Sequence, residues 1–286
     1  MKINDYPSYL KEARALTILM IYTARSGHPG GSLSVIDILS VLANEYLEWS
    51  INFQDDFSKN SLILSKGHAC PALYAVASMN DLIPKEEITT FRKINSRLQG
   101  HPDLKQFSWL GSSTGSLGQG FSVGIGHAMA AKNLNIKKNV FTILGDGELQ
   151  EGQVWEGAMV AAHHNLNNLC AIIDYNKMQS DDLNENISGL EPLADKWSSF
   201  GWNVIEIDGH NIGEIIESID ISISNSTSPS VIIANTVKGK GVGFMENIPK
   251  WHGSVTMSEK ELELSLIDIG YKDKEYEAFL EKYGVN

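Results

Sequence analysis

The chain has 286 residues, of which 42% are apolar, and it carries a formal net charge of -12. This length suits one large α/β domain or two small ones. Its lysines and arginines are scattered, which argues against a nucleic-acid or anionic-membrane surface. No apolar run approaches the ~18 residues of a membrane span, and the amino terminus has no apolar signal core. Cys70 and Cys170 have apolar or small neighbours, which indicates buried, reduced thiols, so we expect a cytoplasmic protein.

Helical periodicity alternates with short apolar runs along the chain. A first amphipathic helix is predicted over residues 6–25 and a second over 34–46, separated by the segment Ser26-Gly-His-Pro-Gly-Gly31. Strands are predicted at 61–64, 140–144, 169–174, 202–207 and 230–234, with a helix at 150–165. A strand-helix-strand order implies parallel strands. We therefore expect one α/β unit over residues 1–257, followed at 258–286 by a charged, helical tail that faces solvent or a partner.

Two polar segments follow neighbouring predicted strands. Gly145-Asp-Gly-Glu148 ends the strand at 140–144, and Asp174-Tyr-Asn176 ends the next strand. Because the carboxyl ends of parallel strands meet at one edge, Asp146 and Asn176 should lie together there. Magnesium takes one or two such oxygen side chains and keeps positions for phosphate oxygens. An isolated Gly-Asp-Gly would be a helix-capping turn, but Asn176, 30 residues after Asp146, favours a metal-bridged diphosphate site.

A glycine-rich segment, Gly111 to Gly120, opens a predicted helix of small residues. Close helix packing explains most of these glycines, and a glycine-rich loop alone is weak evidence for an anion site.

Three histidines lie in predicted loops between glycine and either proline or alanine: Gly27-His28-Pro29, Gly67-His68-Ala69 and Gly100-His101-Pro102. No His or Cys pair with zinc-ligand spacing accompanies them, which disfavours zinc. Each could instead cap neighbouring backbone, although three such loops together favour a shared ligand. Imidazoles donate hydrogen bonds to hydroxyl and carbonyl oxygens and move protons near neutral pH. The set therefore points to a sugar substrate.

These segments occur in the order found in transketolases, which the chain resembles over nearly its whole length: Ser26 to Gly31, Ser65-Lys-Gly-His68, Gly100-His-Pro-Asp103, Thr114 to Gly120, Gly145-Asp-Gly147 and Trp251-His-Gly253. The resemblance implies the thiamine diphosphate-binding fold, a central, mostly parallel sheet with helices on both faces. It also implies the cofactors thiamine diphosphate and Mg²⁺. Lys177 and Asp182 stand where the family often has glycine, which affects the path of the loop after Asn176.

The resemblance assigns a role to each matching residue. Asp146, Asn176 and the main-chain carbonyl of Met178 are implied to hold magnesium. His28, His101 and His252 are implied to face the sugar as catalytic residues. Glu151 resembles the acid that links paired active sites across the subunit interface, with an ordinary helix-capping or solvent-facing glutamate as the alternative. The implied contacts to thiamine diphosphate are His68, Gly115, Ser116, Leu117, Asp146, Gly147, Glu148, Asn176 and His252.

Full transketolases continue to roughly twice this length, into a pyrimidine-binding domain and a carboxyl-terminal domain. The resemblance therefore implies the amino-terminal subunit of a split transketolase, active only with a partner subunit in a two-plus-two heterotetramer. Such an enzyme transfers a two-carbon ketol unit between sugar phosphates in carbohydrate metabolism, for example in the pentose phosphate reactions.

Two other functions stay open. One is a subunit of another thiamine enzyme, of the deoxyxylulose phosphate synthase or two-oxoacid decarboxylating kind. The other is a non-catalytic, cofactor-binding scaffold subunit. His28, His68 and His101 together with Trp251-His-Gly253 favour the transketolase branch.

Overall fold

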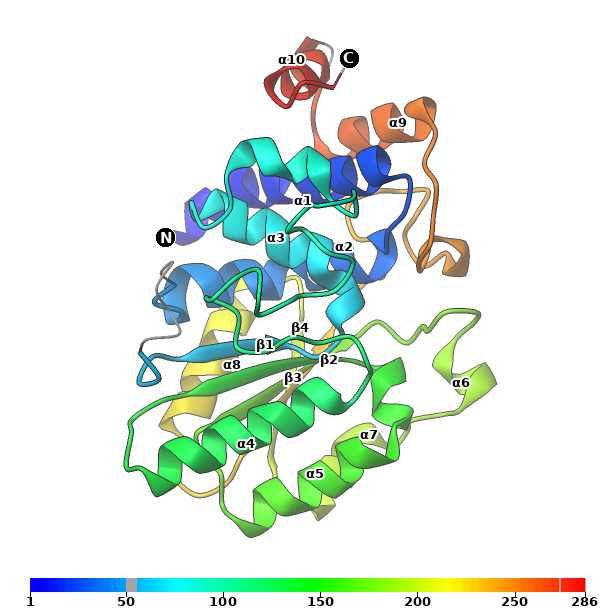
Figure 1. Ribbon diagram of the computed structural model, residues 1–286. Helices are drawn as coiled ribbons and strands as arrows, with labels where there is room; N and C mark the ends of the chain where they lie inside the picture. Colours follow the sequence, from blue (N-terminus) through cyan, green and yellow to red (C-terminus); the bar gives the residue numbers. More distant parts are fainter. Residues whose placement is uncertain (50–55, 273, 286) are drawn as a thin grey trace.

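The computed structural model describes residues 1–49, 56–272 and 274–285. Within these ranges a five-stranded sheet lies at the centre of the molecule (Figure 1). Its strands follow the order β1-β2-β3-β5-β4, and every neighbouring pair is parallel. The strand bounds lie within one residue of those predicted: β1 Ser61–Leu64, β2 Val140–Gly145, β3 Leu169–Tyr175, β4 Asn203–Asp208 and β5 Ser230–Asn235.

Helices cover both faces of the sheet, as predicted (Figure 1). One face carries α2 (Pro29–Val41), α3 (Cys70–Met79) and α8 (Ile212–Ser224), and the other carries α4 (Gln119–Asn133), α5 (Gly152–His163) and α7 (Leu193–Ser199). Successive strand residues point to opposite faces. In β2, for example, Ile143 joins the first core and Leu144 the second. Both faces are therefore buried, which explains why the strands consist of apolar runs without polar alternation.

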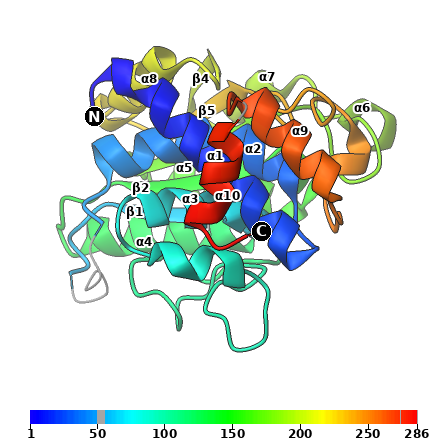
Figure 2. The same cartoon turned by 90° about the horizontal axis from the view of Figure 1, so that it is seen from above.

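The remaining helices form an outer layer and short turns. Helix α1 (Tyr6–Ala24) packs on α2 and α3, and α9 (Glu259–Ile269) packs on α1. Figure 2 shows α9 beside α1, with α10 (Lys274–Lys282, red) crossing over α1 on the outside of the molecule. Short elements are α6 at Asn184–Ile187, a π-helical turn at Leu42–Tyr46, and 3₁₀ turns at Ile3–Asp5, Gly67–Ala69, Lys85–Thr90, Gly147–Gln150 and Pro249–Trp251.

The carboxyl-terminal segment is helical, as expected, and has two faces. Leu262 and Leu266 of α9 are buried in the same core as α1, and Phe279 of α10 joins them. Acidic residues such as Glu259 and Glu263 remain exposed. The division of the chain after residue 257 stays a prediction.

The second helix begins five residues earlier than predicted, at Pro29 rather than residue 34. Proline suits the first helical position because its φ is already helical and its missing N–H would have had no partner there. The carbonyl of His28 then accepts bonds from both the N–H and the hydroxyl of Ser32. The Pro-Gly-Gly segment is thus a first helical turn and not a loop, and His28 is fixed at the point where that helix starts.

Helix α4 packs against the sheet without room for a side chain at Gly124. A Cβ atom there would lie 2.2 Å from Cγ2 of the buried Thr142, whereas a Cβ at Gly126 would meet nothing within 4 Å. We expect Gly124→Ala to lower the free energy of unfolding by about 1–3 kcal/mol through overpacking. Gly126→Ala, on the same helix, should raise it by about 0.5–1 kcal/mol. Urea unfolding of both variants tests this, and equal effects would contradict the packing argument.

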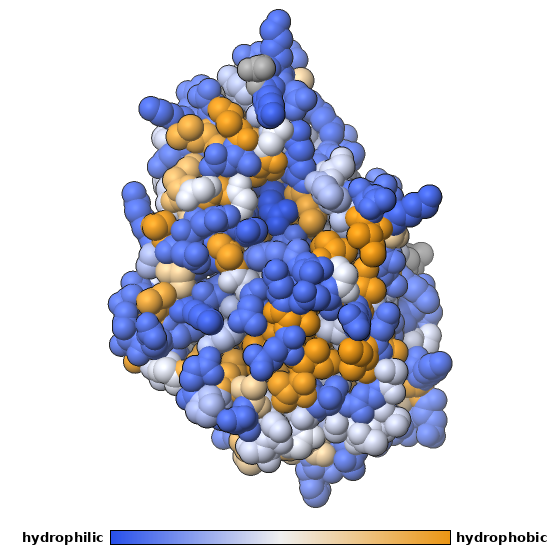
Figure 3. Space-filling view, turned by 180° about the vertical axis from the view of Figure 1, so that it is seen from behind, coloured by the Kyte–Doolittle hydropathy of each residue, from blue (hydrophilic) through white to orange (hydrophobic). Residues whose placement is uncertain are grey.

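The surface mixes polar and apolar residues. Seen from behind, apolar side chains form several patches between hydrophilic ones (Figure 3). Exposed apolar residues include Met159 and Val160 on α5 and Ile221 and Ile223 on α8. In the described ranges no helix is both long enough and apolar enough to pass through a bilayer. Both cysteines are free and buried, as predicted.

Candidate functional site

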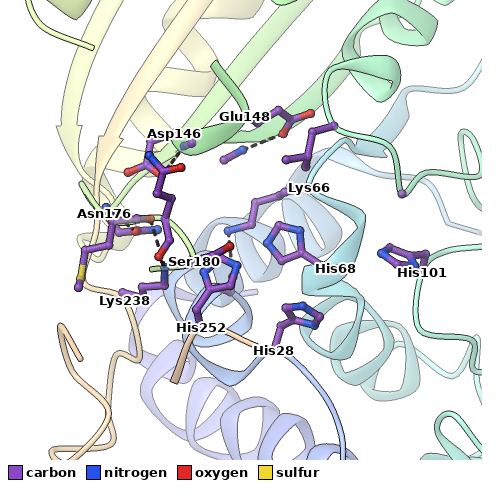
Figure 4. Close-up of a pocket in the computed structure, with 17 residues that line it drawn as sticks. His28, Lys66, His68, His101, Asp146, Glu148, Asn176, Ser180, Lys238 and His252 are labelled. Carbon is purple, nitrogen blue, oxygen red and sulfur yellow. Dashed lines mark hydrogen bonds between the residues drawn. The ribbon is translucent and has the colours of Figure 1, made fainter. Parts of the chain in front are cut away.

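A cavity of about 300 Å³ opens at the carboxyl edge of the sheet (Figure 4). The segments that follow β1, β2, β3 and β5 all contribute to its wall, because parallel strands deliver their carboxyl ends to one edge. The site residues predicted from the sequence that line this cavity are His28, His68, His101, Gly115, Leu117, Asp146, Gly147, Glu148, Asn176, Met178 and His252. Residues far apart in the sequence thus share one site, as their motifs predicted.

Asp146 and Asn176 occupy one side of this cavity (Figure 4). The Asp146 carboxylate accepts hydrogen bonds from the backbone N–H groups of Gly147, at 2.8 Å, and Lys177. Oδ1 of Asn176 accepts from the N–H of Met178 at 3.2 Å. Burial, with the nearby Asp174 carboxylate, raises the pKa of Asp146 to about 6. A divalent cation would remove the cost of keeping this buried carboxylate ionised.

The donor atoms at this position are all oxygens. Asp146 offers a carboxylate, Asn176 an amide oxygen and Met178 a main-chain carbonyl, which are ligands that suit magnesium. Across the described ranges, no group of three or more His, Cys, Asp or Glu side chains is arranged to hold a metal ion. The site therefore fits a hard cation that takes few protein ligands and completes its shell with water or phosphate oxygens.

Two buried lysines reach the same cavity, and neither was predicted from the sequence. Lys66 is 2% exposed and donates to the carbonyl of Gly31 at 3.0 Å and to the Asp174 carboxylate. Lys238 is 1% exposed and donates to the carbonyls of Met178, at 3.2 Å, and Gln179, at 2.9 Å. Each lysine stands beside glycine just after a strand, in Ser65-Lys-Gly-His68 and Val237-Lys-Gly-Lys-Gly241. A lysine beside glycine at the end of a parallel strand is the sequence feature that could have indicated cationic side chains at this edge of the sheet.

Asp174 is fully buried, pairs with the cavity-lining Lys66 and ties four elements together. Its carboxylate accepts from Lys66 after β1, Ser34 on α2 and Thr236 after β5, while Asp174 itself belongs to β3. Burial alone would raise its pKa, but the Lys66 ammonium and the two hydroxyls hold the pKa of Asp174 below its ordinary value. The Lys66–Asp174 ion pair beside the cavity is therefore fixed, and the hydrogen-bonding capacity of its carboxylate is largely used.

Three imidazoles cluster opposite the oxygen ligands (Figure 4). The ring centroid of His28 lies 5.1 Å from that of His68 and 5.8 Å from that of His252, and those of His68 and His252 are 5.5 Å apart. His101 is set apart from them but lines the same cavity, next to Gly115. Nδ1 of His28 and Nδ1 of His252 are buried and have no hydrogen-bond partner in the described part of the chain. A polar ligand would supply what they lack.

Comparison with known families decides the relationship. A family model described as transketolase, thiamine diphosphate binding domain, matches residues 7–283. This chain belongs to the transketolase family. The predicted thiamine diphosphate-binding fold is therefore confirmed.

Relatives of known function are transketolases and transketolase subunits. The 6-deoxy-6-sulfo-D-fructose transketolase subunit SqwG of Clostridium sp. (strain MSTE9) is 41% identical over 233 residues, which cover 82% of this chain and 85% of that subunit. One of the apulose-4-phosphate transketolase subunits, from Phocaeicola vulgatus, is 34% identical over 260 residues, or 91% of this chain and 92% of the relative. The predicted resemblance to the amino-terminal subunit of a split transketolase is confirmed.

Solved transketolases share the fold and are longer. The structure of transketolase from Campylobacter jejuni superposes with a TM-score of 0.87 and 29% sequence identity. It covers 94% of this chain, whereas this chain spans 43% of that one. The chain thus corresponds to less than half of an undivided transketolase.

Burial keeps the histidines of this transketolase subunit neutral. Burial, with the nearby Arg92 guanidinium, lowers the pKa of His28 to about 4. Burial, with the nearby Lys238 ammonium, lowers the pKa of His252 to about 3. The pKa values of His68 and His101 are also lowered, first by burial. Near pH 7 these rings carry no charge, so each can accept a proton at one nitrogen and donate from the other.

This neutral state predicts acid sensitivity of the fold. In the unfolded chain His28 binds a proton below its ordinary pKa of 6.5, whereas in the folded protein it binds one only near pH 4. The unfolded state therefore binds more protons between these pH values. The contribution of His28 to stability is present above pH 6.5 and is lost as the pH falls toward 4. We expect the stability lost between about pH 7 and about pH 5 to be smaller by about 2 kcal/mol in His28→Gln. Urea unfolding of wild type and of His28→Gln at both pH values measures this difference. The pKa of Asp146 is raised rather than lowered, but Asp146 is present in both proteins, so the comparison isolates His28. Identical losses would contradict it.

Three predicted site residues differ from the rest: Glu148 lines the cavity but its carboxylate is bound by other protein groups, and Ser116 and Glu151 are not among the lining residues. Glu148 is buried, and its carboxylate accepts from Gly118 N at 2.7 Å, Gly145 N at 3.0 Å and the hydroxyl of Ser65. These bonds brace the ends of β1, β2 and α4, so a direct contact of Glu148 with a cofactor stays a prediction. The side chain of Ser116 is exposed, and Glu151 is exposed at the start of α5, away from the cavity lining.

Proposed function

We propose that this chain binds thiamine diphosphate and Mg²⁺ as the amino-terminal subunit of a transketolase that transfers a two-carbon ketol unit from a ketose or ketose phosphate to an aldose or aldose phosphate. One observation carries the proposal. The oxygen ligands of Asp146, Asn176 and Met178 share a single cavity with three clustered, neutral imidazoles. A hard-cation site beside proton-transferring groups suits a diphosphate cofactor and a hydroxylated substrate.

In this proposal the two ends of the cavity have different tasks. Asp146, Asn176 and the Met178 carbonyl hold the magnesium that neutralises the diphosphate. The ammonium groups of Lys66 and Lys238 add positive charge beside it. The carboxylates of Asp146 and Asp174 offset these two lysines, and a bound metal and diphosphate would balance one another. The other proposed cofactor contacts, to His68, Gly115, Ser116, Leu117, Gly147, Glu148 and His252, complete the set.

When bound, thiamine diphosphate supplies the carbon nucleophile that attacks a ketose carbonyl. His28, His101 and His252 then act on the substrate's oxygens. A neutral imidazole donates a hydrogen bond to the carbonyl oxygen as charge develops there. Another accepts the proton of the neighbouring hydroxyl when the carbon-carbon bond breaks, and returns it to the aldose that receives the ketol unit. The lowered pKa values of all three keep the rings unprotonated at neutral pH, so each has a nitrogen lone pair free for a substrate proton or hydrogen bond.

A partner subunit is part of the proposal. The relatives that match along most of their length are named as subunits, and this chain spans less than half of a solved transketolase. We propose that a second polypeptide supplies the pyrimidine-binding domain in a two-plus-two heterotetramer. Glu151 and the exposed apolar residues Met159 and Val160, all at or on α5, support an interface there.

The proposal gives the donor ketose and the acceptor aldose by chemical class, and the substrate panel must identify them. By their names, one relative is a transketolase for 6-deoxy-6-sulfo-D-fructose and another for apulose-4-phosphate. Ketoses with different terminal groups therefore belong in the substrate panel, alongside simple ketose phosphates.

The test is ketol transfer in the presence of Mg²⁺ and thiamine diphosphate, with the chain alone and with its partner subunit co-expressed. We expect activity in the mixture and none with the chain alone. Cofactor binding by the complex without transfer from any ketose in the panel would overturn the catalytic role and favour a scaffold subunit. Turnover of pyruvate in place of a ketose would favour another class of thiamine enzyme.

A further inference from the structure

A second cavity of about 440 Å³ adjoins the first one and shares part of its wall. Three side chains line both cavities, namely His28, His252 and Ser180, and Figure 4 shows them together along one side of the first cavity. The other residues that line the second cavity, which we call the outer cavity, are Asp181, Pro249, Lys250, Gly253 and Ser254. A molecule bound by the imidazoles can therefore extend into a space whose wall contains none of the proposed metal ligands.

The segment that carries Lys250 is fixed against the imidazoles. Pro249–Trp251 form a 3₁₀ turn, which is closed by a bond of 2.8 Å from the N–H of His252 to the carbonyl of the first residue of the turn. A Cβ atom at Gly253 would lie 2.1 Å from Cδ2 of His28, so the backbone contacts that ring directly. The backbone position of Lys250 is therefore set, and its side chain is the part that can adjust to a ligand in the outer cavity.

Lys250 and Asp181 are the charged side chains among the described residues that line the outer cavity, because His28 and His252 are neutral near pH 7. Lys250 is exposed, and within the described ranges its ammonium group has no hydrogen bond or ion pair. It lies 5.7 Å from the centroid of the Trp251 ring, a contact that leaves its N–H donors free. On a chain with a formal net charge of -12, this free cation is a local attraction for anions.

The proposed reaction requires a place for the part of the sugar that does not react. The outer cavity adjoins the imidazoles that act on the reacting carbon atoms, so the rest of the carbon chain fits there. Hydroxyl groups along that chain can bond to the hydroxyls of Ser180 and Ser254 and donate to the Asp181 carboxylate. A phosphate or sulfonate at the end of the chain offers negative charge and several acceptor oxygens, which suit an ammonium group.

We propose that the outer cavity is the subsite for the far end of the sugar, and that Lys250 selects sugars whose terminal group is an anion, either a phosphate or a sulfonate. The inference rests on the proposed function and names the substrate class of the same site. Lys250 is a specificity-determining residue, because it contacts the terminal group and takes no part in breaking or forming the carbon-carbon bond. Its removal should therefore affect anionic sugars and leave uncharged sugars unaffected.

The experiment measures kcat/KM for ketol transfer by the chain co-expressed with its partner, with Mg²⁺ and thiamine diphosphate present. With one donor ketose, the acceptor is D-glyceraldehyde, its 3-phosphate or its 3-deoxy-3-sulfonate analogue. We expect wild type to prefer the anionic acceptors, and the better of the two identifies the terminal group. In Lys250→Met, kcat/KM for that acceptor should fall by at least about tenfold, mainly through KM, while the value for uncharged glyceraldehyde should change by less than about twofold.

Three further variants test whether the charge of Lys250 is responsible. Lys250→Arg keeps the positive charge and should retain most of the preference for the anionic acceptor. Asp181→Asn removes the negative charge from the same cavity and should strengthen that preference. Lys260→Met is the matched control, since Lys260 is an exposed lysine on α9 that lines neither cavity, and it should behave as wild type.

Circular dichroism verifies that each variant is folded. The same preference in wild type and in folded Lys250→Met, or an equal loss with charged and uncharged acceptors, would overturn the inference while ketol transfer itself stands. A wild-type preference for uncharged glyceraldehyde would overturn it as well. Failure of the proposed function gives a different result, in which the wild-type complex transfers no ketol unit from any ketose in the panel, and the inference then fails with it.

Discussion

Replacing Asp146 with alanine is expected to abolish magnesium-dependent binding of thiamine diphosphate, weakening it on the order of 100-fold or more. Asp146 is 2% exposed and provides the carboxylate among the proposed metal ligands. Without it, Asn176 and the Met178 carbonyl offer only neutral oxygens. Calorimetric titration of the chain, or of its complex with the partner, with thiamine diphosphate in the presence and absence of Mg²⁺ measures the loss.

The matched variant is His101→Ala. His101 lines the same cavity but lies apart from the metal ligands and from the other imidazoles. We expect its cofactor affinity to remain close to wild type while turnover in the complex falls by about 10²–10⁴-fold, the usual contribution of a general acid or base. An equal loss of cofactor binding in Asp146→Ala and His101→Ala would contradict the roles assigned to both residues.

Asp174→Asn is expected to cause the largest loss of stability, about 3–5 kcal/mol. The change leaves the Lys66 ammonium buried without a counter-charge and weakens the bonds from Ser34 and Thr236. Because these partners come from α2 and from the ends of β1 and β5, the damage extends to the whole carboxyl edge of the sheet. Urea unfolding followed by circular dichroism gives the change in the free energy of unfolding.

An exposed ion pair provides the control. Arg97 and Glu87 form a two-bond contact at 2.6 and 3.1 Å, but their side chains are 43% and 28% exposed. Glu87→Gln should therefore cost less than about 1 kcal/mol. Asp174→Leu combined with Lys66→Met, which removes both charges together, should recover much of the stability that Asp174→Asn loses. Similar effects for Asp174→Asn and Glu87→Gln would show that the buried pair does not hold the sheet edge.

Local sequence signals located the strands well, and they placed the proposed metal ligands Asp146 and Asn176 at one edge of the sheet. Each strand is a short apolar run, because a parallel sheet covered on both faces needs no polar alternation. Asp146 and Asn176 could be placed together from chain order alone, since consecutive parallel strands end at the same edge. The start of the second helix was predicted wrongly because Pro-Gly-Gly is typical of loops, whereas Pro29 in fact occupies a first helical turn.

Lys66 and Lys238 were not predicted as cavity residues because their burial has no local signal. A lysine next to glycine is ordinarily a solvated loop residue. Only the tertiary structure brings Asp174 and the Met178 carbonyl to these ammonium groups and makes their burial tolerable. The burial of Glu148 likewise depends on tertiary contacts, because its carboxylate accepts bonds from Gly118, Gly145 and Ser65 in three segments.

The sequence by itself determined the strand-helix-strand order, the oxygen ligands at the sheet edge and the histidine loops, because these depend on residue type and on spacing along one chain. The tertiary structure alone decided which charges are buried, which of them are paired, and which way their side chains point. Those properties depend on contacts between segments that are distant along the chain, such as Lys66 with Asp174, and no local pattern records such contacts.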